Sequence, residues 1–214
     1  MKIEGVLWDM DGVLVDTAEL HYQSWYDALM GRGVDFSREI FAATFGKNNE
    51  ETMRMLLGET ANKREAEQIA GEKEAAFRKS IRSGIKLMPG VIRWLNNFQA
   101  KSILQAVASS APMANIEVII DECRIGQYFR TVNSGTGMLS KPHPDIFLAA
   151  AQSIDVQPQN CLVIEDSRMG VEAAKNASMY CVAVSMSSLA DDLSAADVVV
   201  DSLEALSESD LDNI

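Results

Sequence analysis

The chain has 214 residues, of which 47% are hydrophobic, and its net charge is −12 at pH 7. This length and composition suit one sizeable domain, or a core that carries an inserted segment. No Lys or Arg follows Lys175, so we expect no nucleic acid partner, because such a partner requires clustered cations. No apolar run is long enough to span a membrane, and the N-terminal residues form no signal-peptide pattern, so we expect a cytoplasmic protein.

Few cysteine and histidine residues are available for chemistry. The three cysteines lie far apart in apolar segments, which indicates reduced, buried thiols at Cys123, Cys161 and Cys181. His21 and His143 are the only histidines, which makes a histidine zinc site or a Ser-His-Asp triad improbable. It also contains no G-x-S-x-G motif.

Short apolar runs alternate with helical patterns along much of the chain. The runs predicted as strands are residues 3–8, 103–108, 129–133, 161–164, 180–184 and 198–200. Between them, Ile116, Ile119 and Ile120 repeat at the spacing of one helix face, and Pro112 and Pro144 suit the first turns of helices. This alternation predicts an α/β fold with a doubly wound, mainly parallel, Rossmann-like sheet, in which ligands bind at the carboxyl ends of the strands.

The segment from residue 17 to residue 88 breaks this alternation and is predicted to be helical, without a convincing strand. Helices are expected near 50–57 and 61–83, and Asp16 with Glu19 has the spacing of a capping box before an earlier helix. Such an insertion after the first strand predicts a separate lobe over the site. The predicted division is a core of residues 1–16 and 89–214, a helical cap domain of residues 17–88, and hinges at Val15–Thr17 and Leu87–Gly90.

The most informative motif is Asp9-Met10-Asp11-Gly12, directly after the apolar run Val6-Leu7-Trp8. Because side chains alternate between faces along a strand, Asp9 and Asp11 can converge on one site only where the chain leaves the sheet. Two neighbouring carboxylates repel each other and favour a bound cation, most simply Mg²⁺. An Asp-Gly turn alone would explain Asp11 and Gly12 but not Asp9.

Further polar side chains occur where later segments of the predicted core end. Ser109 and Ser110 end the second core strand, Lys141 lies in a proline-containing loop, and Glu165 and Asp166 end another strand. Each has an ordinary interpretation, as a helix cap, a solvated cation or an acidic helix start. Together at the carboxyl ends of strands, they supply a hydroxyl, an ammonium group and carboxylates. These are the functional groups that bind and transfer a phosphoryl group.

With these motifs in this order, the chain resembles the haloacid-dehalogenase superfamily, and most closely its β-phosphoglucomutase-like phosphatases and mutases with a helical cap. The resemblance implies that Asp9 is the nucleophile that becomes an aspartyl phosphate, and that Asp11 is the general acid and base. It implies that Ser109 binds the phosphoryl oxygens and that Lys141 neutralises charge. The residues it implies for a Mg²⁺ site are Asp9, Asp166, the backbone carbonyl of Asp11, and Glu165 nearby or through water.

Substrate specificity is expected to depend on residues beside the phosphoryl site. The candidates for substrate binding are Gly12, Ser110, His21, Lys47 and Asn49. His21 resembles a histidine of the sugar-phosphate mutases, but many plain phosphatases of the family also carry one, and a hydrogen bond between cap and core is the simpler explanation. The mutases place an Arg in the turn after a cap glycine, where this chain has Lys47 and Asn49, and Lys does not replace Arg for bidentate phosphate binding. This departure favours hydrolysis over phosphoryl transfer to a second hydroxyl.

We therefore expect a monomeric, Mg²⁺-dependent phosphatase that hydrolyses a small phosphorylated metabolite, most simply a sugar phosphate. The alternative is a β-phosphoglucomutase-type sugar phosphomutase, which must bind a bisphosphate. A second alternative, from another class, is a phospho-Asp signalling or binding module, because receiver-like domains also combine a strand-end Asp with acids and a Lys. The helical insertion and the Asp11-Gly12 pair argue against that module.

Overall fold

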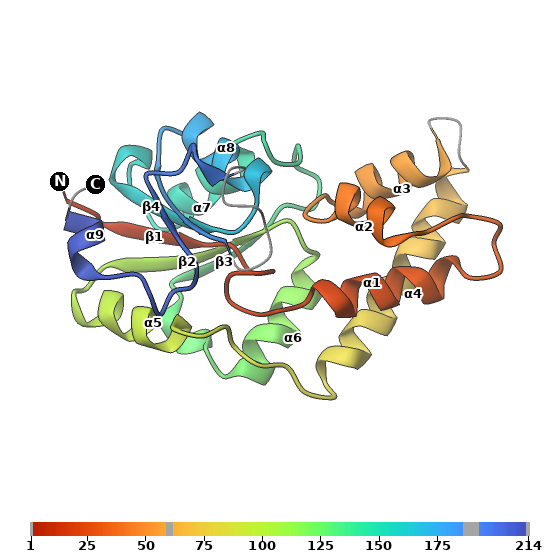
Figure 1. Ribbon diagram of the computed structural model, residues 1–214, viewed down its shortest axis with the longest axis horizontal. Coiled ribbons are helices and arrows are strands. Elements are labelled where there is room, and N and C mark those ends of the chain that lie inside the picture. Colours follow the sequence, from red (N-terminus) through yellow and green to blue (C-terminus); the bar gives the residue numbers. More distant parts are fainter. Residues whose placement is uncertain (1, 59–61, 186–192, 213–214) are drawn as a thin grey trace.

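The computed structural model describes residues 2–58, 62–185 and 193–212. It has two lobes, an α/β core and a smaller lobe built of helices, which we call the helical lobe (residues 18–81; Figure 1). The two lobes meet beside the carboxyl end of the sheet, where the first strand passes into the first helix (Figure 1).

The core is one parallel sheet. Its described strands are β1 (Gly5–Trp8), β2 (Leu104–Ser109), β3 (Thr131–Ser134), β4 (Cys161–Glu165), β5 (Tyr180–Val184) and β6 (Val198–Val200). They lie in the order β3-β2-β1-β4-β5-β6, and every neighbouring pair is parallel. Each strand overlaps one of the predicted runs, so the predicted doubly wound α/β fold is confirmed. The chain moves outward from β1 to β3 and then returns to β4, which puts the topological switch point between β1 and β4.

Helices cover both faces of this sheet. One face packs against α5 (Val91–Ala100) and α6 (Met113–Cys123), and the other against α7 (Asp145–Ser153) and α8 (Arg168–Asn176) (Figure 1). In β1, Val6 and Trp8 belong to the first hydrophobic cluster and Leu7 to the second. Strands buried on both faces need apolar residues at every position, which explains the unbroken apolar run. The remaining core elements are η1 (Gly126–Tyr128), η2 (Pro158–Asn160) and α9 (Glu208–Asp212).

The helical lobe has its own hydrophobic centre. Its helices are α1 (Ala18–Leu29), α2 (Arg38–Thr44), α3 (Asn49–Leu57) and α4 (Lys63–Ile81). Their shared cluster of buried side chains consists of Trp25, Ala28, Leu29, Phe36, Met53 and Ile69. Asn48 and Asn62 cap α3 and α4 by accepting hydrogen bonds from first-turn backbone N–H groups, which fixes where these predicted helices begin. The far end of α4 leaves this cluster, because Phe77 and Ile81 pack into the core instead.

The predicted capping box of Asp16 and Glu19 is wrong. α1 begins at Ala18, and its N-cap residue Thr17 makes no side-chain capping hydrogen bond. Thr17 is fully buried, and its hydroxyl donates to Asp11 instead. Glu19 turns outward and forms an exposed ion pair with Arg38, with Nη1 and Oε2 at 2.8 Å. The hydrogen bond from Thr17 to Asp11, which joins residues 6 positions apart, therefore replaces the helix cap that the spacing of Asp16 and Glu19 predicted.

Two chain segments connect the lobes side by side. Val15, on the way out, forms an antiparallel bridge with Leu87, on the way back. The Met88 N–H donates to the Leu14 carbonyl at 2.9 Å, which reinforces the same crossing. This paired crossing lies where we expected the hinges.

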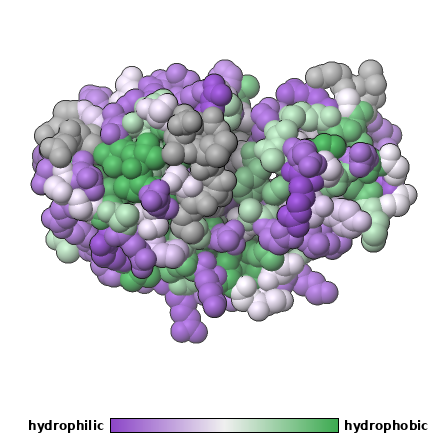
Figure 2. Space-filling view, viewed as in Figure 1, coloured by the Kyte–Doolittle hydropathy of each residue, from purple (hydrophilic) through white to green (hydrophobic). Residues whose placement is uncertain are grey.

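On the face drawn in Figure 2, hydrophilic residues predominate and hydrophobic residues gather only in small separate patches. In the described part of the chain, no helix has both the length and the hydropathy to cross a bilayer. The cysteines are unpaired; Cys161 and Cys181 are buried as expected, whereas Cys123 is only half-buried because it ends α6 near the surface.

Candidate active site

The strand ends at the switch point carry the predicted chemistry. Asp9 follows β1, Ser109 is the last residue of β2, and Glu165 is the last residue of β4. Neighbouring parallel strands end at the same edge, so these three side chains gather there. They line a cavity of about 610 Å³, which we call the phosphoryl cavity; its lining also includes Asp11, Gly12, Ser110, Lys141 and Asp166.

Lys141 lies between two buried carboxylates and forms an ion pair with each of them. Its Nζ donates to Asp9 Oδ1 and to Glu165 Oε1, both at 2.5 Å, and all three side chains are at least nine-tenths buried. Burial alone would lower the pKa of Lys141, but the charges of Asp9 and Glu165 hold that pKa above its ordinary value. Burial, opposed by Lys141 and reinforced by Glu165 and Asp11, raises the pKa of Asp9 to about 7. The cluster thus holds more negative charge than Lys141 alone can balance.

Glu165 is fixed by the start of α8. Its Oε2 accepts hydrogen bonds from the N–H groups of Asp166 and Ser167, each at 2.7 Å, and from the Ser167 hydroxyl at 3.0 Å. A Cβ on Gly170 would lie 1.8 Å from Glu165 Oε1, so only glycine leaves room for this carboxylate. Donors at a helix N-terminus suit an anion, and they aim the other oxygen of Glu165 at Lys141.

Gly12 leaves room for the carboxylate of Asp166, the residue that follows β4. Its φ of +83° is the left-handed conformation that glycine adopts at little cost. A Cβ there would lie 2.0 Å from Asp166 Oδ2. The turn after β1 and the end of β4 can approach each other this closely only because residue 12 has no side chain.

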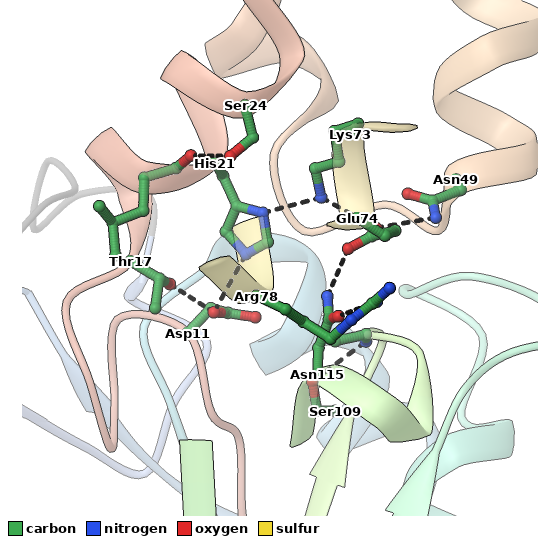
Figure 3. Close-up of polar contacts among 12 residues, drawn as sticks. Asp11, Thr17, His21, Ser24, Asn49, Lys73, Glu74, Arg78, Ser109 and Asn115 are labelled. Atoms are coloured by element: carbon green, nitrogen blue, oxygen red, sulfur yellow. Dashed lines mark hydrogen bonds and ion pairs between the residues drawn. The ribbon is translucent and has the colours of Figure 1, made fainter. Parts of the chain in front are cut away.

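A series of polar contacts connects Asp11 to the helical lobe and fixes its carboxylate (Figure 3). Thr17 donates its hydroxyl hydrogen to Asp11 Oδ1, and His21 Nε2 lies 3.3 Å from the same oxygen. Lys73 Nζ lies 2.9 Å from His21 Nδ1. An ammonium group can only donate, so Nδ1 accepts and the ring proton is on Nε2, which donates to Asp11. Although burial opposes it, His21 and Thr17 lower the pKa of Asp11, so Asp11 is a carboxylate here.

A second set of contacts joins α4 to the core next to this series (Figure 3). Glu74 accepts hydrogen bonds from Lys73 Nζ at 2.9 Å, from Asn49 Nδ2 at 2.8 Å, and from Asn115 Nδ2 on α6. Arg78 Nη1 donates to the other side of Asn115, at 2.9 Å from Oδ1. The helical lobe and the core are therefore joined by side chains directly beside the phosphoryl cavity.

Comparisons with known proteins identify the family. The family model described as haloacid dehalogenase-like hydrolase matches residues 6–184. The chain belongs to this family. It is 31% identical over 189 residues to β-phosphoglucomutase of Bacillus subtilis (85% of this chain, 83% of the relative). It is 26% identical over 184 residues to fructose-1-phosphate phosphatase YqaB of Escherichia coli (86% and 97%). A crystal structure of β-phosphoglucomutase from Clostridium difficile superimposes with a TM-score of 0.90 at 27% identity (99% and 96%).

The oxygen donors of this hydrolase fit a hard divalent cation. Within residues 2–58, 62–185 and 193–212, no three His, Cys, Asp or Glu side chains form a preassembled metal cage. However, burial and the charges of Glu165 and Asp9 raise the pKa of Asp166 well above its ordinary value, so this edge of the sheet lacks positive charge. Mg²⁺ commonly takes one or two carboxylates and keeps several waters. Asp9, Asp166 and the Asp11 carbonyl suit such a site, whereas both oxygens of Glu165 already have donors.

The structure also places the other predicted site residues of the hydrolase. Ser109 is buried, and its Oγ accepts from the Ala111 N–H at 3.1 Å; it does not cap α6, whose N-cap is Pro112. Ser110 lies in the lining of the phosphoryl cavity and of a narrower cavity beside it. His21, Lys47 and Asn49 line that narrower cavity from the lobe side.

Sequence reasoning missed Thr17, Lys73, Glu74 and Asn115. For Lys73 a signal existed, because it lies midway between Ile69 and Phe77 at the four-residue spacing of the buried face of α4. A Lys at a core-facing helical position is uncommon unless it has a partner. Near the end of α4, Arg78 reaches the core, whereas Lys79 and the C-cap residue Arg82 are exposed.

Proposed function

We propose that this protein is a Mg²⁺-dependent phosphatase that hydrolyses a small phosphorylated metabolite, most simply a sugar phosphate, through an aspartyl-phosphate intermediate. The observation that carries the proposal is the buried ammonium group of Lys141, which binds Asp9 while Asp11 is held two residues away by Thr17 and His21. A nucleophile, a charge-neutralising cation and a proton-transfer group around one cavity are what this chemistry requires, and this arrangement supports those three roles. The relatives named for sugar phosphate chemistry support the substrate class.

In the first step, a carboxylate oxygen of Asp9 attacks the phosphorus, and the bond from phosphorus to the leaving oxygen breaks. Lys141 balances the charge of the approaching dianion, and Ser109 donates to a phosphoryl oxygen. Asp11 protonates the leaving oxygen. Because its neighbours hold Asp11 as a carboxylate, the negative charge of the bound phosphate must first raise its pKa.

In the second step, water attacks the aspartyl phosphate and gives a proton to Asp11, which releases inorganic phosphate and regenerates Asp9. Bound Mg²⁺, held by Asp9, Asp166 and the Asp11 carbonyl, would lower the repulsion between the nucleophile and a phosphate dianion. His21 and Thr17 keep the Asp11 carboxylate oriented through both steps.

We propose further that residues 17–88 act as a cap over a core of residues 1–16 and 89–214. The lobe contacts the loop before Lys141, where Asn48 Nδ2 donates to the Met138 carbonyl at 3.4 Å. With the paired crossing at Val15 and Leu87 as the hinge, opening would admit substrate, and closure would exclude water during the first step.

Release of phosphate from a panel of phosphorylated sugars, nucleotides and small acids tests this function. We expect phosphate release with Mg²⁺, none with EDTA, and recovery when Mg²⁺ is restored. Asp9→Asn should remove turnover while the protein stays folded. Phosphate release by that variant at the wild-type rate would refute the mechanism.

A sugar phosphomutase is the second candidate, supported by the similarity to β-phosphoglucomutases. The same panel should therefore include β-glucose 1-phosphate with a trace of the bisphosphate. Formation of glucose 6-phosphate with little free phosphate would replace the phosphatase with the mutase.

A further inference from the structure

A narrow cavity of about 50 Å³ adjoins the phosphoryl cavity on the side of the helical lobe. Asp11 and Ser110 line both cavities, so the narrow one is accessible to a leaving group that takes a proton from Asp11. Glu74 lines its lobe side, and also lines a larger cavity of about 600 Å³ that follows. A substrate with a longer leaving group therefore also passes Glu74.

The cations on this wall are already paired with carboxylates. Lys73 Nζ lies 2.9 Å from Glu74 Oε1, with both side chains more than nine-tenths buried. Lys47 Nζ lies 2.5 Å from Glu51 Oε1 nearer the surface. These two pairs carry no net charge, so a second phosphate placed against them would bring uncompensated negative charge next to two carboxylates.

Glu74 is ionised and keeps room for one more donor. Burial opposes its ionisation, but the Lys73 charge and the amide donors Asn115 and Asn49 lower its pKa below the ordinary value. An ionised carboxylate offers about four acceptor positions, and Lys73, Asn49 and Asn115 occupy three of them. The remaining position can accept a hydrogen bond from a hydroxyl group and cannot accept one from a fully ionised phosphate.

We propose that Glu74 is a specificity-determining residue that selects monophosphates of hydroxylated metabolites and rejects substrates with a second phosphate. This inference deepens the proposed phosphatase function and rests on it. The carboxylate accepts a hydrogen bond from a hydroxyl of the leaving group, and its charge repels a distal phosphoryl group at the same place. The same property disfavours mutase chemistry, because a mutase must bind a bisphosphate in this cavity.

The test compares matched pairs of substrates, fructose 1-phosphate with fructose 1,6-bisphosphate and glucose 1-phosphate with glucose 1,6-bisphosphate. We expect the wild-type Ki of each bisphosphate, measured as an inhibitor of monophosphate hydrolysis, to exceed the KM of its monophosphate about tenfold or more. Glu74→Gln keeps the size and one acceptor but removes the charge. In that variant the ratio of Ki to KM should fall by about tenfold.

Glu72→Gln is the matched control, because Glu72 lies on the same helix, is partly exposed and pairs with Arg32 away from the cavities. It should leave the ratio unchanged. A folded, active Glu74→Gln variant with the wild-type ratio would overturn the proposal and leave the phosphatase function intact. If that variant does not fold, the wild-type protein decides: a bisphosphate Ki at or below the monophosphate KM overturns the proposal. Hydrolysis of no monophosphate by the wild-type protein would refute the phosphatase function itself, and this inference with it.

Discussion

Two helical glycines should respond in opposite ways to the same substitution. Replacing glycine by alanine inside a helix ordinarily stabilises it by about 1 kcal/mol, because alanine loses less backbone entropy on folding. At Gly71, in α4, an added Cβ meets no heavy atom within 4 Å, so Gly71→Ala should show this ordinary gain. At Gly170, in α8, the added Cβ would lie 1.8 Å from Glu165 Oε1 and 2.4 Å from Oε2.

The cost at Gly170 follows from what holds Glu165. Its carboxylate accepts from two backbone N–H groups and one hydroxyl, and pairs with Lys141. Hydrogen bonds to a charged group contribute about 1.5–3 kcal/mol each, so losing two of them costs roughly 3–6 kcal/mol. After the helix gain is subtracted, Gly170→Ala should destabilise the protein by roughly 2–5 kcal/mol, or roughly 4–20 °C in Tm for a chain of this size.

Urea and thermal unfolding of the two variants and the wild-type protein measure this difference directly. Phosphate release from the best substrate of the panel should fall by about a hundredfold or more in Gly170→Ala, because Lys141 loses one of the carboxylates that position it. Gly71→Ala should keep wild-type activity. If Gly170→Ala unfolds at or above the wild-type temperature, Glu165 does not occupy the space that the structure assigns to it, and the reasoning fails.

Three further predictions concern the buried charges and Asp11. Lys141→Ala should lower stability by about 3–5 kcal/mol in urea unfolding, because it leaves Asp9 and Glu165 buried without their cation; an unchanged midpoint would mean that the ion pairs do not form. Asp9→Asn should leave the Tm of the metal-free protein unchanged or higher, since it removes one charge from a cluster with excess negative charge, and a lower Tm by differential scanning fluorimetry would contradict this. Thr17→Val, which keeps the shape but removes the hydroxyl donor to Asp11, should lower kcat about tenfold with a smaller effect on KM; a wild-type kcat would show that Asp11 does not depend on Thr17.

The core and the strand-end chemistry could be predicted from the sequence, because both depend on local patterns. The apolar runs mark strands buried on both faces, and Asp9, Ser109 and Glu165 each end a predicted strand. Once the sheet is parallel, strand ends meet at one edge, so their proximity follows from chain order alone. The spacing of Asp9, Asp11 and Gly12 likewise needs nothing beyond the geometry of a strand passing into a turn.

The side-chain contacts on the lobe side of the site could not be predicted in this way, although His21, Lys47 and Asn49 were expected near it. The contacts of Lys73 with His21, and of Glu74 with Asn115, join residues 52 and 41 positions apart, and no sequence period relates them. The capping-box prediction failed for the same reason, because the buried hydroxyl of Thr17 donates to a partner in the core rather than to its own helix.

By itself, therefore, the sequence determined the doubly wound sheet, the helical insertion and the acidic strand ends, since short-range patterning decides which faces are buried and where each strand stops. Only the tertiary structure decided that Lys141 binds both Asp9 and Glu165, that Lys73 pairs with Glu74, and that Glu74 lines the cavity beside Asp11. The angle at which one helical lobe packs against the core fixes these contacts, and that angle depends on many side chains distant from one another in the chain.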